Sequence, residues 1–282
     1  MHLYSVNTGY FKLDGGAMFG VVPKVIWNKL NPADENNLCP WALRSLLIED
    51  GNRLILVDNG MGDKQDAKFF GHYHMHGEDS LDKSLAKYGF GREDITDVIL
   101  THLHFDHCGG SIYRKGDTLL PSFPRAVYWS NTRHWDWATK PNEREKASFL
   151  KENILPIEAC GQLQMVDMAD TGLTSFSNNI SIRFVNGHTD AQMLPQIQYK
   201  GRTLVFMADL LPSVAHLPIP YVMAYDMFPL TSLQEKKSFL HEALAGDYIL
   251  FFEHDPVYEC CTLQQTDRGI RMKEHFRMDE LT

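Results

Sequence analysis

The stretch THLHFDHCGG, residues 101–110, places three histidines and one aspartate within six positions. It directly follows the apolar run DVIL, residues 97–100, which has the length of a short buried strand. A sheet holds the backbone at a strand end, so the loop after the strand is a suitable place for ligand residues. Gly109 and Gly110 then allow a sharp exit and close approach of the backbone. The stretch therefore predicts a strand that ends in a metal-binding loop.

Imidazole and carboxylate groups are common ligands of Zn(II) and similar divalent ions. Alternate residues of an extended segment share a face, so His102 and His104 would bind one ion together. Asp106 and His107 lie past the strand, where a turn would direct them to a second ion. The alternative is a chance run of surface polar residues, which the density of ligand types in this stretch disfavours.

Four side chains do not complete two coordination shells, so further ligands must come from later in the chain. Three residues follow later apolar runs at strand-like positions: His188, Asp209 and His254. A single histidine or aspartate after a strand is common and by itself means little. Three such placements together with residues 102–107 predict a site assembled from several strand ends.

Apolar runs of strand length, bounded by turn residues, predict strands over residues 44–48, 53–57, 97–100, 126–129, 180–185, 196–199, 203–207 and 248–252. Helical patterns predict helices over residues 80–88, 142–152 and 232–244. In the last, Ser232 and Glu235 have capping-box spacing, and one face carries Leu233, Lys237, Leu240 and Leu244. This mixture predicts a layered sheet protein with helices outside. No Pro/Gly/Ser-rich linker divides it, so residues 1–282 are expected to form one domain.

The composition limits the partners. The net charge of −9, without a basic tract, disfavours nucleic acid and acidic membrane surfaces. No window approaches ~18 uninterrupted apolar residues and no signal peptide is visible, so we expect no membrane span and a cytoplasmic location. The five cysteines have no CxxC spacing, which predicts reduced, mostly buried thiols and no thiolate zinc site.

The candidate ligands resemble those of the metallo-β-lactamase-fold hydrolase superfamily. Its HxHxDH signature matches residues 102–107, its later GHT matches residues 187–189, and its strand–Asp–Gly element matches LVDNG, residues 56–60. Asp209 matches the bridging aspartate and His254 the last histidine. The resemblance spans about residues 46–255. It implies an α+β fold, a four-layer αββα sandwich of two mixed β-sheets with a dinuclear metal site at one edge.

The resemblance also implies a role for each ligand. The first ion would be held by His102, His104 and His188, and the second by Asp106, His107 and His254. Asp209 would bridge both ions, and Asp58 would orient a ligand or the loop from behind. The expected ions are two Zn(II), with Mn(II) or Fe(II) as alternatives. Asp106 and Asp209 are the residues implied in catalysis by a metal-bound hydroxide.

The segments DGGAMFG (14–20), VPK (22–24) and GMGDK (60–64) are similar to a subgroup that contains lactonases and organophosphate hydrolases. In that subgroup the N-terminal segment, here residues 1–40, lies near the active-site mouth. Some of its lactonases have a tyrosine three residues past the bridging aspartate, where this chain has Pro212; Tyr221 or Tyr225 would have to replace it. Substrate contacts are expected, with core packing as an equal alternative, from Met18, Phe19, Trp27, Phe105 and Tyr221.

The predicted activity is hydrolysis of a small-molecule ester, lactone or phosphotriester. The alternatives are a mononuclear iron dioxygenase on the same fold, a broad-specificity thioesterase or β-lactam hydrolase, and a non-catalytic scaffold; the full set of seven ligands favours two metals and catalysis. The sequence leaves open whether the chain forms a homodimer. His72, His74 and His76 lack a nearby carboxylate and are predicted to lie in a mobile loop or lid. Cys108 is predicted to be a packed neighbour of the site.

Overall fold

The computed structural model describes residues 1–169 and 172–281. The chain divides into two compact units. Unit 1 consists of Met1–Gly9 and Leu43–Thr174, and unit 2 of Tyr10–Ala42 and Ser175–Thr282. The expectation of one domain over residues 1–282 stays a prediction.

Most strands of unit 1 belong to a six-stranded sheet in the order β1-β2-β3-β4-β7-β8. Strands β2 and β3 are antiparallel, whereas β3, β4, β7 and β8 run parallel to one another. The bounds are β1 (His2–Asp14), β2 (Leu38–Asp50), β3 (Arg53–Val57), β4 (Asp97–Ile99), β7 (Val127–Ser130) and β8 (Leu163–Met165). The first two strands extend into the residues of unit 2. A separate hairpin consists of β5 (Ile112–Lys115) and β6 (Thr118–Pro121).

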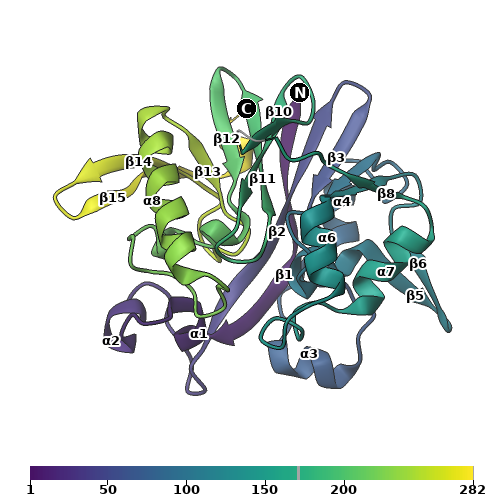
Figure 1. The fold of residues 1–282 in the computed structure, drawn as a ribbon, viewed down its shortest axis with the longest axis horizontal. Helices are drawn as coiled ribbons and strands as arrows, with labels where there is room; N and C mark the ends of the chain where they lie inside the picture. Colours follow the sequence, from purple (N-terminus) through teal and green to yellow (C-terminus); the bar gives the residue numbers. More distant parts are fainter. Residues whose placement is uncertain (170–171, 282) are drawn as a thin grey trace. The chain divides into compact units, whose positions relative to one another are not determined.

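The helices of unit 1 are α3 (Ala67–Tyr73), α4 (Leu81–Lys87), α5 (Phe105–Cys108), the 3-10 turn η1 (Gly109–Ser111), α6 (Thr132–Thr139) and α7 (Lys151–Ala159). Helix α7 contacts both strands of the hairpin (Figure 1). One apolar core joins strand residues such as Leu56, Val98 and Tyr128 to helix residues such as Leu85 and Ile157. Strands β3 and β4 are buried on both faces, as is common in parallel sheets.

Unit 2 is built on a seven-stranded mixed sheet in the order β15-β14-β13-β12-β11-β10-β9. Its strands are β9 (Leu173–Ser175), β10 (Ile180–Val185), β11 (Gln192–Tyr199), β12 (Arg202–Phe206), β13 (Ile249–Phe251), β14 (Cys260–Thr266) and β15 (Gly269–Phe276). Its helices are α1 (Gly15–Phe19), α2 (Lys24–Trp27), η2 (Ala208–Leu210), η3 (Val214–His216), α8 (Pro229–Ala245) and η4 (Met278–Leu281). The long helix α8 contacts β14 and β15 (Figure 1).

Strand direction decides where the loops with ligand residues emerge. In unit 2, β12 and β13 are parallel, with Phe206 opposite Phe251. Strand β10 has the same direction as β12, because both are antiparallel to β11. In unit 1, β3 and β4 are parallel, with Val57 opposite Ile99. Within each unit, the carboxyl ends that precede the candidate ligands therefore meet at one edge of the sheet.

The strands predicted from apolar runs are confirmed, with β2 and β11 longer than predicted. The first predicted helix is confirmed as α4, whose N-cap Ser80 accepts a hydrogen bond from the Lys83 amide. The helix predicted over residues 142–152 is wrong, because turns occupy most of this range and α7 begins only at Lys151. Asn142 Oδ1 accepts hydrogen bonds from the amides of Arg144 and Glu145. Such side-chain turns compete with helix formation.

The third predicted helix is confirmed as α8, but its start and buried face are not as predicted. The helix begins at Pro229, and proline is favoured in a first helical turn. Ser232 therefore lies inside the helix, and Glu235 accepts hydrogen bonds from the amides of Asn186 and Gly187. The buried face consists of Ser232, Lys236, Phe239, Leu240 and Ala243, so of the predicted face only Leu240 is buried.

The histidine-rich segment is also partly helical. Residues 67–73 form α3, because the Asp66 side chain caps the helix by accepting from the Phe69 amide. The loop predicted around His72 is therefore wrong for that residue, which lies in the last turn of α3.

Four of the five cysteines are buried and Cys160 is exposed, which confirms mostly buried thiols. Within residues 1–169 and 172–281, no helix combines the length and the apolar character needed to cross a bilayer.

Aromatic packing fixes the N-terminal part of unit 2. The Phe19 ring is stacked between Trp27, with centroids 5.3 Å apart, and His216, with centroids 4.7 Å apart. His216 donates from Nε2 to the Met18 carbonyl at 2.9 Å, and its Nδ1 accepts from the Ser213 hydroxyl at 2.8 Å. Both nitrogens are thus satisfied in the neutral imidazole, and burial lowers the His216 pKa to about 3.

This burial predicts a contribution to acid sensitivity. Below pH 6.5 the unfolded chain protonates His216 whereas the folded chain does not, so folding stability falls with pH until about pH 3. At pH 5 the loss is about 2 kcal/mol, at ~1.36 kcal/mol per pH unit. In urea unfolding, His216→Gln should lose about 2 kcal/mol less than the unmodified chain between pH 7 and pH 5. The exposed control His241→Gln should keep the original pH dependence, and equal losses in all three chains would contradict the assignment.

Candidate metal centre

The loop after β4 is held by close backbone contacts within unit 1. The His107 carbonyl accepts from the Asn59 amide at 2.9 Å, and the Gly60 carbonyl accepts from the Gly110 amide at 2.9 Å. A Cβ atom on Gly109 would lie 2.1 Å from the Met61 oxygen, and one on Gly110 would lie 2.2 Å from the Asn59 oxygen. Only glycine therefore fits where the exits of β3 and β4 meet.

Asp58 connects the two ends of this loop. Its carboxylate is fully buried and accepts from the Thr101 amide at 2.8 Å and from the Thr101 hydroxyl at 2.6 Å. The same carboxylate lies 3.1 Å from His107 Nδ1. Asp58 itself has a φ of 54°, in the left-handed region that non-glycine residues seldom adopt. The backbone conformation at the end of β3 thus places the Asp58 carboxylate against the loop that follows β4.

These hydrogen bonds also fix the tautomers of two histidines. Because the Thr101 hydroxyl donates its hydrogen to Asp58, its oxygen accepts from His102 Nδ1 at 3.1 Å. His107 donates from Nδ1 to Asp58. In both rings Nε2 is then the nitrogen with the lone pair, which is the form that coordinates a metal. Asp106 Oδ2 lies 3.7 Å from His107 Nε2.

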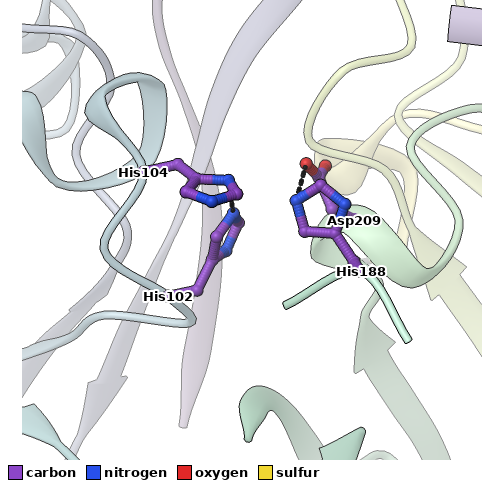
Figure 2. Close-up of side chains that lie close together, drawn as sticks. All are labelled: His102, His104, His188 and Asp209. Carbon is purple, nitrogen blue, oxygen red and sulfur yellow. Dashed lines mark hydrogen bonds and ion pairs between the residues drawn. The ribbon is translucent and has the colours of Figure 1, made fainter. Parts of the chain in front are cut away.

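His104 has the opposite arrangement. Its Nε2 lies 2.9 Å from the carboxylate of Glu145, so Nδ1 has the lone pair. This Nδ1 lies 3.0 Å from His102 Nε2, and Figure 2 shows the two rings converging. All four ligand-type side chains, His102, His104, Asp106 and His107, are buried and of types that could hold a metal ion.

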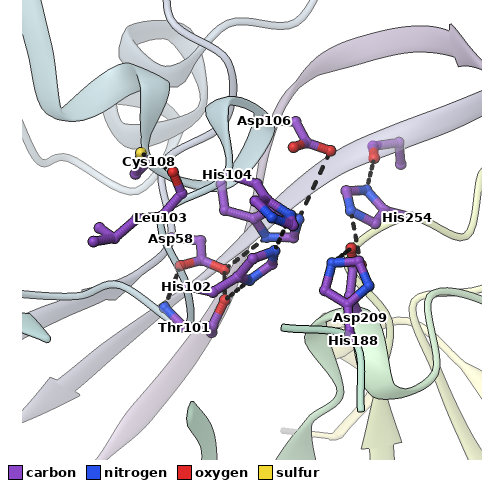
Figure 3. A network of polar contacts seen from close by, with 12 residues as sticks. Asp58, Thr101, His102, Leu103, His104, Asp106, Cys108, His188, Asp209 and His254 are labelled. Atoms are coloured by element: carbon purple, nitrogen blue, oxygen red, sulfur yellow. Dashed lines mark hydrogen bonds and ion pairs between the residues drawn. The ribbon is translucent and has the colours of Figure 1, made fainter. Parts of the chain in front are cut away.

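Unit 2 presents the other three candidate ligands around one carboxylate. Asp209 Oδ2 lies 3.1 Å from His188 Nε2, and Asp209 Oδ1 lies 3.2 Å from His254 Nε2 (Figures 2 and 3). Each histidine is bonded at its other nitrogen: His188 Nδ1 to Asp226 at 2.9 Å, and His254 Nδ1 to the Ala42 carbonyl at 2.8 Å. The two oxygens of Asp209 thus face two different imidazoles.

Three residues that support these ligands were missed in the sequence. Thr101 directly precedes His102, but a threonine after a strand gives no signal by itself. Glu145 lies in the segment wrongly predicted as a helix, and Asp226 is a single aspartate in the loop before α8. Their contacts join residues 41 and 38 positions apart, which no local pattern indicates. A further buried histidine, His134, accepts from the Leu103 amide at 2.9 Å.

The residues expected to contact substrate have different surroundings. In unit 2, Met18, Phe19 and Trp27 are buried, whereas Tyr221 is half-buried and lines a small cavity together with Asp209, Pro212 and Asp226. In unit 1, Phe105 packs edge-on against Phe69 of α3 and beside Tyr73. Packing is therefore observed for the first three, and substrate contact stays a prediction.

The neighbours of the unit 1 loop have structural roles. The buried Lys64 ammonium donates to the Gly109 carbonyl at 2.5 Å, and burial lowers its pKa to about 8. Cys108 is fully buried and its thiol contacts the Leu103 carbonyl, and burial raises its pKa to about 12. His72, His74 and His76 are exposed, and no candidate group of metal ligands among the described residues includes them.

Comparisons with known proteins identify the family of the chain and proteins that share its fold. The family model of the metallo-beta-lactamase superfamily matches residues 44–254. A probable metal-dependent hydrolase from Staphylococcus aureus has 28% identity and a TM-score of 0.88, over 98% of this chain and 96% of that one. AidC, a dizinc quorum-quenching lactonase, has 22% identity and a TM-score of 0.79, over 97% of this chain and 94% of that one. The hydrolase AbOPH has 20% identity and a TM-score of 0.76, over 98% of this chain and 94% of that one. The predicted α+β fold class is confirmed.

The glycine contacts in the unit 1 loop predict a specific sensitivity. Gly109→Ala should destabilise the chain by about 1–3 kcal/mol, because the added methyl group overlaps the Met61 carbonyl. The matched control is Gly71→Ala, since that glycine lies in α3 with no atom within 4 Å of the added carbon. The control should be neutral or slightly stabilising. Urea unfolding measures both, and equal midpoints would contradict the close approach.

Proposed function

The chain belongs to the metallo-beta-lactamase superfamily, and we propose that it is a metal-dependent hydrolase that uses two divalent ions to hydrolyse a small ester, lactone or phosphotriester. The observation that carries the proposal is the arrangement of acceptor groups. His102 Nε2 and His104 Nδ1 face each other at 3.0 Å, and both oxygens of Asp209 face imidazole lone pairs. Groups that only accept repel one another unless a cation lies between them.

The donor set fits borderline divalent ions of the zinc type. It consists of imidazole nitrogens and carboxylate oxygens without thiolate, and each histidine has its other nitrogen bonded to an acceptor. Such outer bonds fix the orientation and the tautomer of metal-binding histidines. We propose Zn(II) as the native ion, with Mn(II) or Fe(II) as alternatives that the same donors accept.

We assign the ligands to two ions by the family pattern and the separate geometry of each unit. The first ion would take His102, His104 and His188, and the second Asp106, His107 and His254. Asp209 would bridge both, which suits a carboxylate whose two oxygens face two different histidines. Asp58 would position the loop from behind rather than coordinate, because both of its oxygens accept hydrogen bonds from Thr101.

Two bound divalent ions supply an activated water, by lowering its pKa from ~15.7 toward ~7, and polarise the substrate oxygen. The residues of the chain then have two tasks. Asp209 would hold the ions at a fixed separation. We propose Asp106, whose side chain is 12% exposed against 0% for His107, as the carboxylate that would accept the proton of the water and return it to the leaving oxygen.

The surroundings of Asp209 support a proposal for the group that contacts the substrate. Tyr221 lines the same small cavity as Asp209 and Asp226, and Pro212 occupies the position where some lactonases have a tyrosine. We therefore propose that Tyr221 contacts the substrate oxygen in place of that tyrosine. The fold likeness to AidC, a dizinc lactonase, supports a small ester-like substrate. The homodimer and the cytoplasmic location stay predictions.

The test is a metal-quantified activity panel of lactones, aryl esters, thioesters, phosphotriesters and β-lactams. We expect two divalent ions per chain and turnover of an ester, lactone or phosphotriester. In His102→Ala, turnover should fall more than ~100-fold with loss of metal, since even the outer-shell partners of a metal site contribute ~10–100-fold. The control is His72→Ala, at an exposed histidine of α3, and it should keep the turnover and the metal content of the unmodified chain. One iron per chain with O₂-dependent turnover would instead identify a dioxygenase.

A further inference from the structure

We infer that Glu145 is a positioning residue that fixes which ring nitrogen of His104 is available to a metal ion. The inference rests on the proposed function, because it concerns a ligand of the same site. Glu145 lies in the turn before α7, and its side chain is 2% exposed. Its Oε1 lies 2.9 Å from His104 Nε2.

The second oxygen of Glu145 has donors of its own. Oε2 accepts from the Trp137 indole Nε1–H at 2.6 Å and, at a longer 3.4 Å, from the Asn142 amide. An indole N–H only donates, so Oε2 must accept. An ionised carboxylate accepts at both oxygens, and His104 therefore donates from Nε2 and holds its lone pair on Nδ1.

His104 differs in this respect from the other four candidate histidines. Those four are bonded at Nδ1 and present Nε2, whereas His104 is bonded at Nε2 and presents Nδ1. The difference matters because Nδ1 of His104 is the atom that lies 3.0 Å from His102 Nε2. With the opposite tautomer, His104 would direct an N–H group toward the position that the proposed ion takes.

The surrounding segment holds Glu145 in place. Asn142 Oδ1 accepts from the Glu145 amide at 3.1 Å, and the Ser148 carbonyl accepts from the Phe105 amide at 3.0 Å. The Phe149 ring packs against the His104 ring with centroids 4.8 Å apart. The turn is thus attached on both sides of Glu145, and the carboxylate has little freedom to leave His104.

This geometry requires two acceptor oxygens at position 145, which a carboxylate supplies and an amide of the same shape does not. In Glu145→Gln, the one amide oxygen satisfies either Trp137 or His104. If it accepts from Trp137, the NH₂ group faces His104 Nε2 and favours the tautomer with the hydrogen on Nδ1. If it accepts from His104, the NH₂ group faces the indole N–H, and two donors oppose each other. Removing the indole N–H with Trp137→Phe relieves this conflict.

The experiment measures zinc affinity of the full chain by competition with a chromophoric chelator. Glu145→Gln should weaken binding of the ion held by His104 by ~10–100-fold. The double variant Glu145→Gln/Trp137→Phe should regain most of this loss, because the amide oxygen then accepts from His104. The matched control Glu49→Gln, at a carboxylate that accepts from the Tyr4 hydroxyl, should bind zinc as the unmodified chain does. Unchanged affinity in Glu145→Gln overturns the inference, as does a loss that the double variant does not recover.

A spectroscopic measurement tests the unmodified chain, so the inference remains testable if a variant fails to fold. Long-range ¹H–¹⁵N spectra of the zinc-loaded chain report the state of each ring nitrogen. We expect a protonated Nε2 and a zinc-bound Nδ1 for His104, and zinc bound at Nε2 for His102. A zinc-bound Nε2 on His104 overturns the inference. If the tautomer and affinities are as expected but no panel substrate is turned over, the proposed function fails and the role of Glu145 stands.

Discussion

The structure of the candidate centre depends on one constraint: each ligand histidine has one ring nitrogen committed to an acceptor within its own unit. Asp58 accepts from His107, Glu145 lies against His104, and Asp226 lies against His188, while the backbone carbonyl of Ala42 accepts from His254. A buried polar group without a partner costs about 1–3 kcal/mol, so these bonds are required whether or not a metal is bound. Once they form, the remaining nitrogen of each neutral ring is the one that holds the lone pair.

This constraint explains which parts of the site the sequence could predict. The ligands themselves were found because each follows an apolar run, and strand ends are local features: Asp209 and His254 both come three residues after paired strand residues, Phe206 and Phe251. Asp58 was expected from the family resemblance, but Glu145 and Asp226 were not found, because they come from turns whose position is set by tertiary packing. A carboxylate in a turn has the same sequence signal whether it faces water or a histidine.

The errors in the helices have the same origin. Ser232 and Glu235 have the spacing of a capping box, but Glu235 serves the amides of Asn186 and Gly187, which precede His188. Asn142 and Glu145 read as helical positions, but Asn142 closes the turn that places Glu145 beside His104. In both segments, side chains with a common local use are instead used to hold a ligand loop. At these positions the tertiary contacts of the candidate site, and not the local helix propensity, decide the role of the side chain.

Preparing the ligands in this way has a conformational cost that the fold must offset. Asp58 and Ala208, at the exits of β3 and β12, both have positive φ, 54° and 40°, a conformation that costs about 1–3 kcal/mol per non-glycine residue. At Asp58 the cost is offset by two hydrogen bonds to Thr101, of 2.8 and 2.6 Å. At Ala208 the backbone turns Asp209 toward two imidazoles, whose lone pairs oppose its carboxylate until a cation joins them. The same opposition of lone pairs occurs in unit 1 between His102 Nε2 and His104 Nδ1, so in each unit a bound cation would add a favourable interaction that the hydrogen bonds of the fold do not supply.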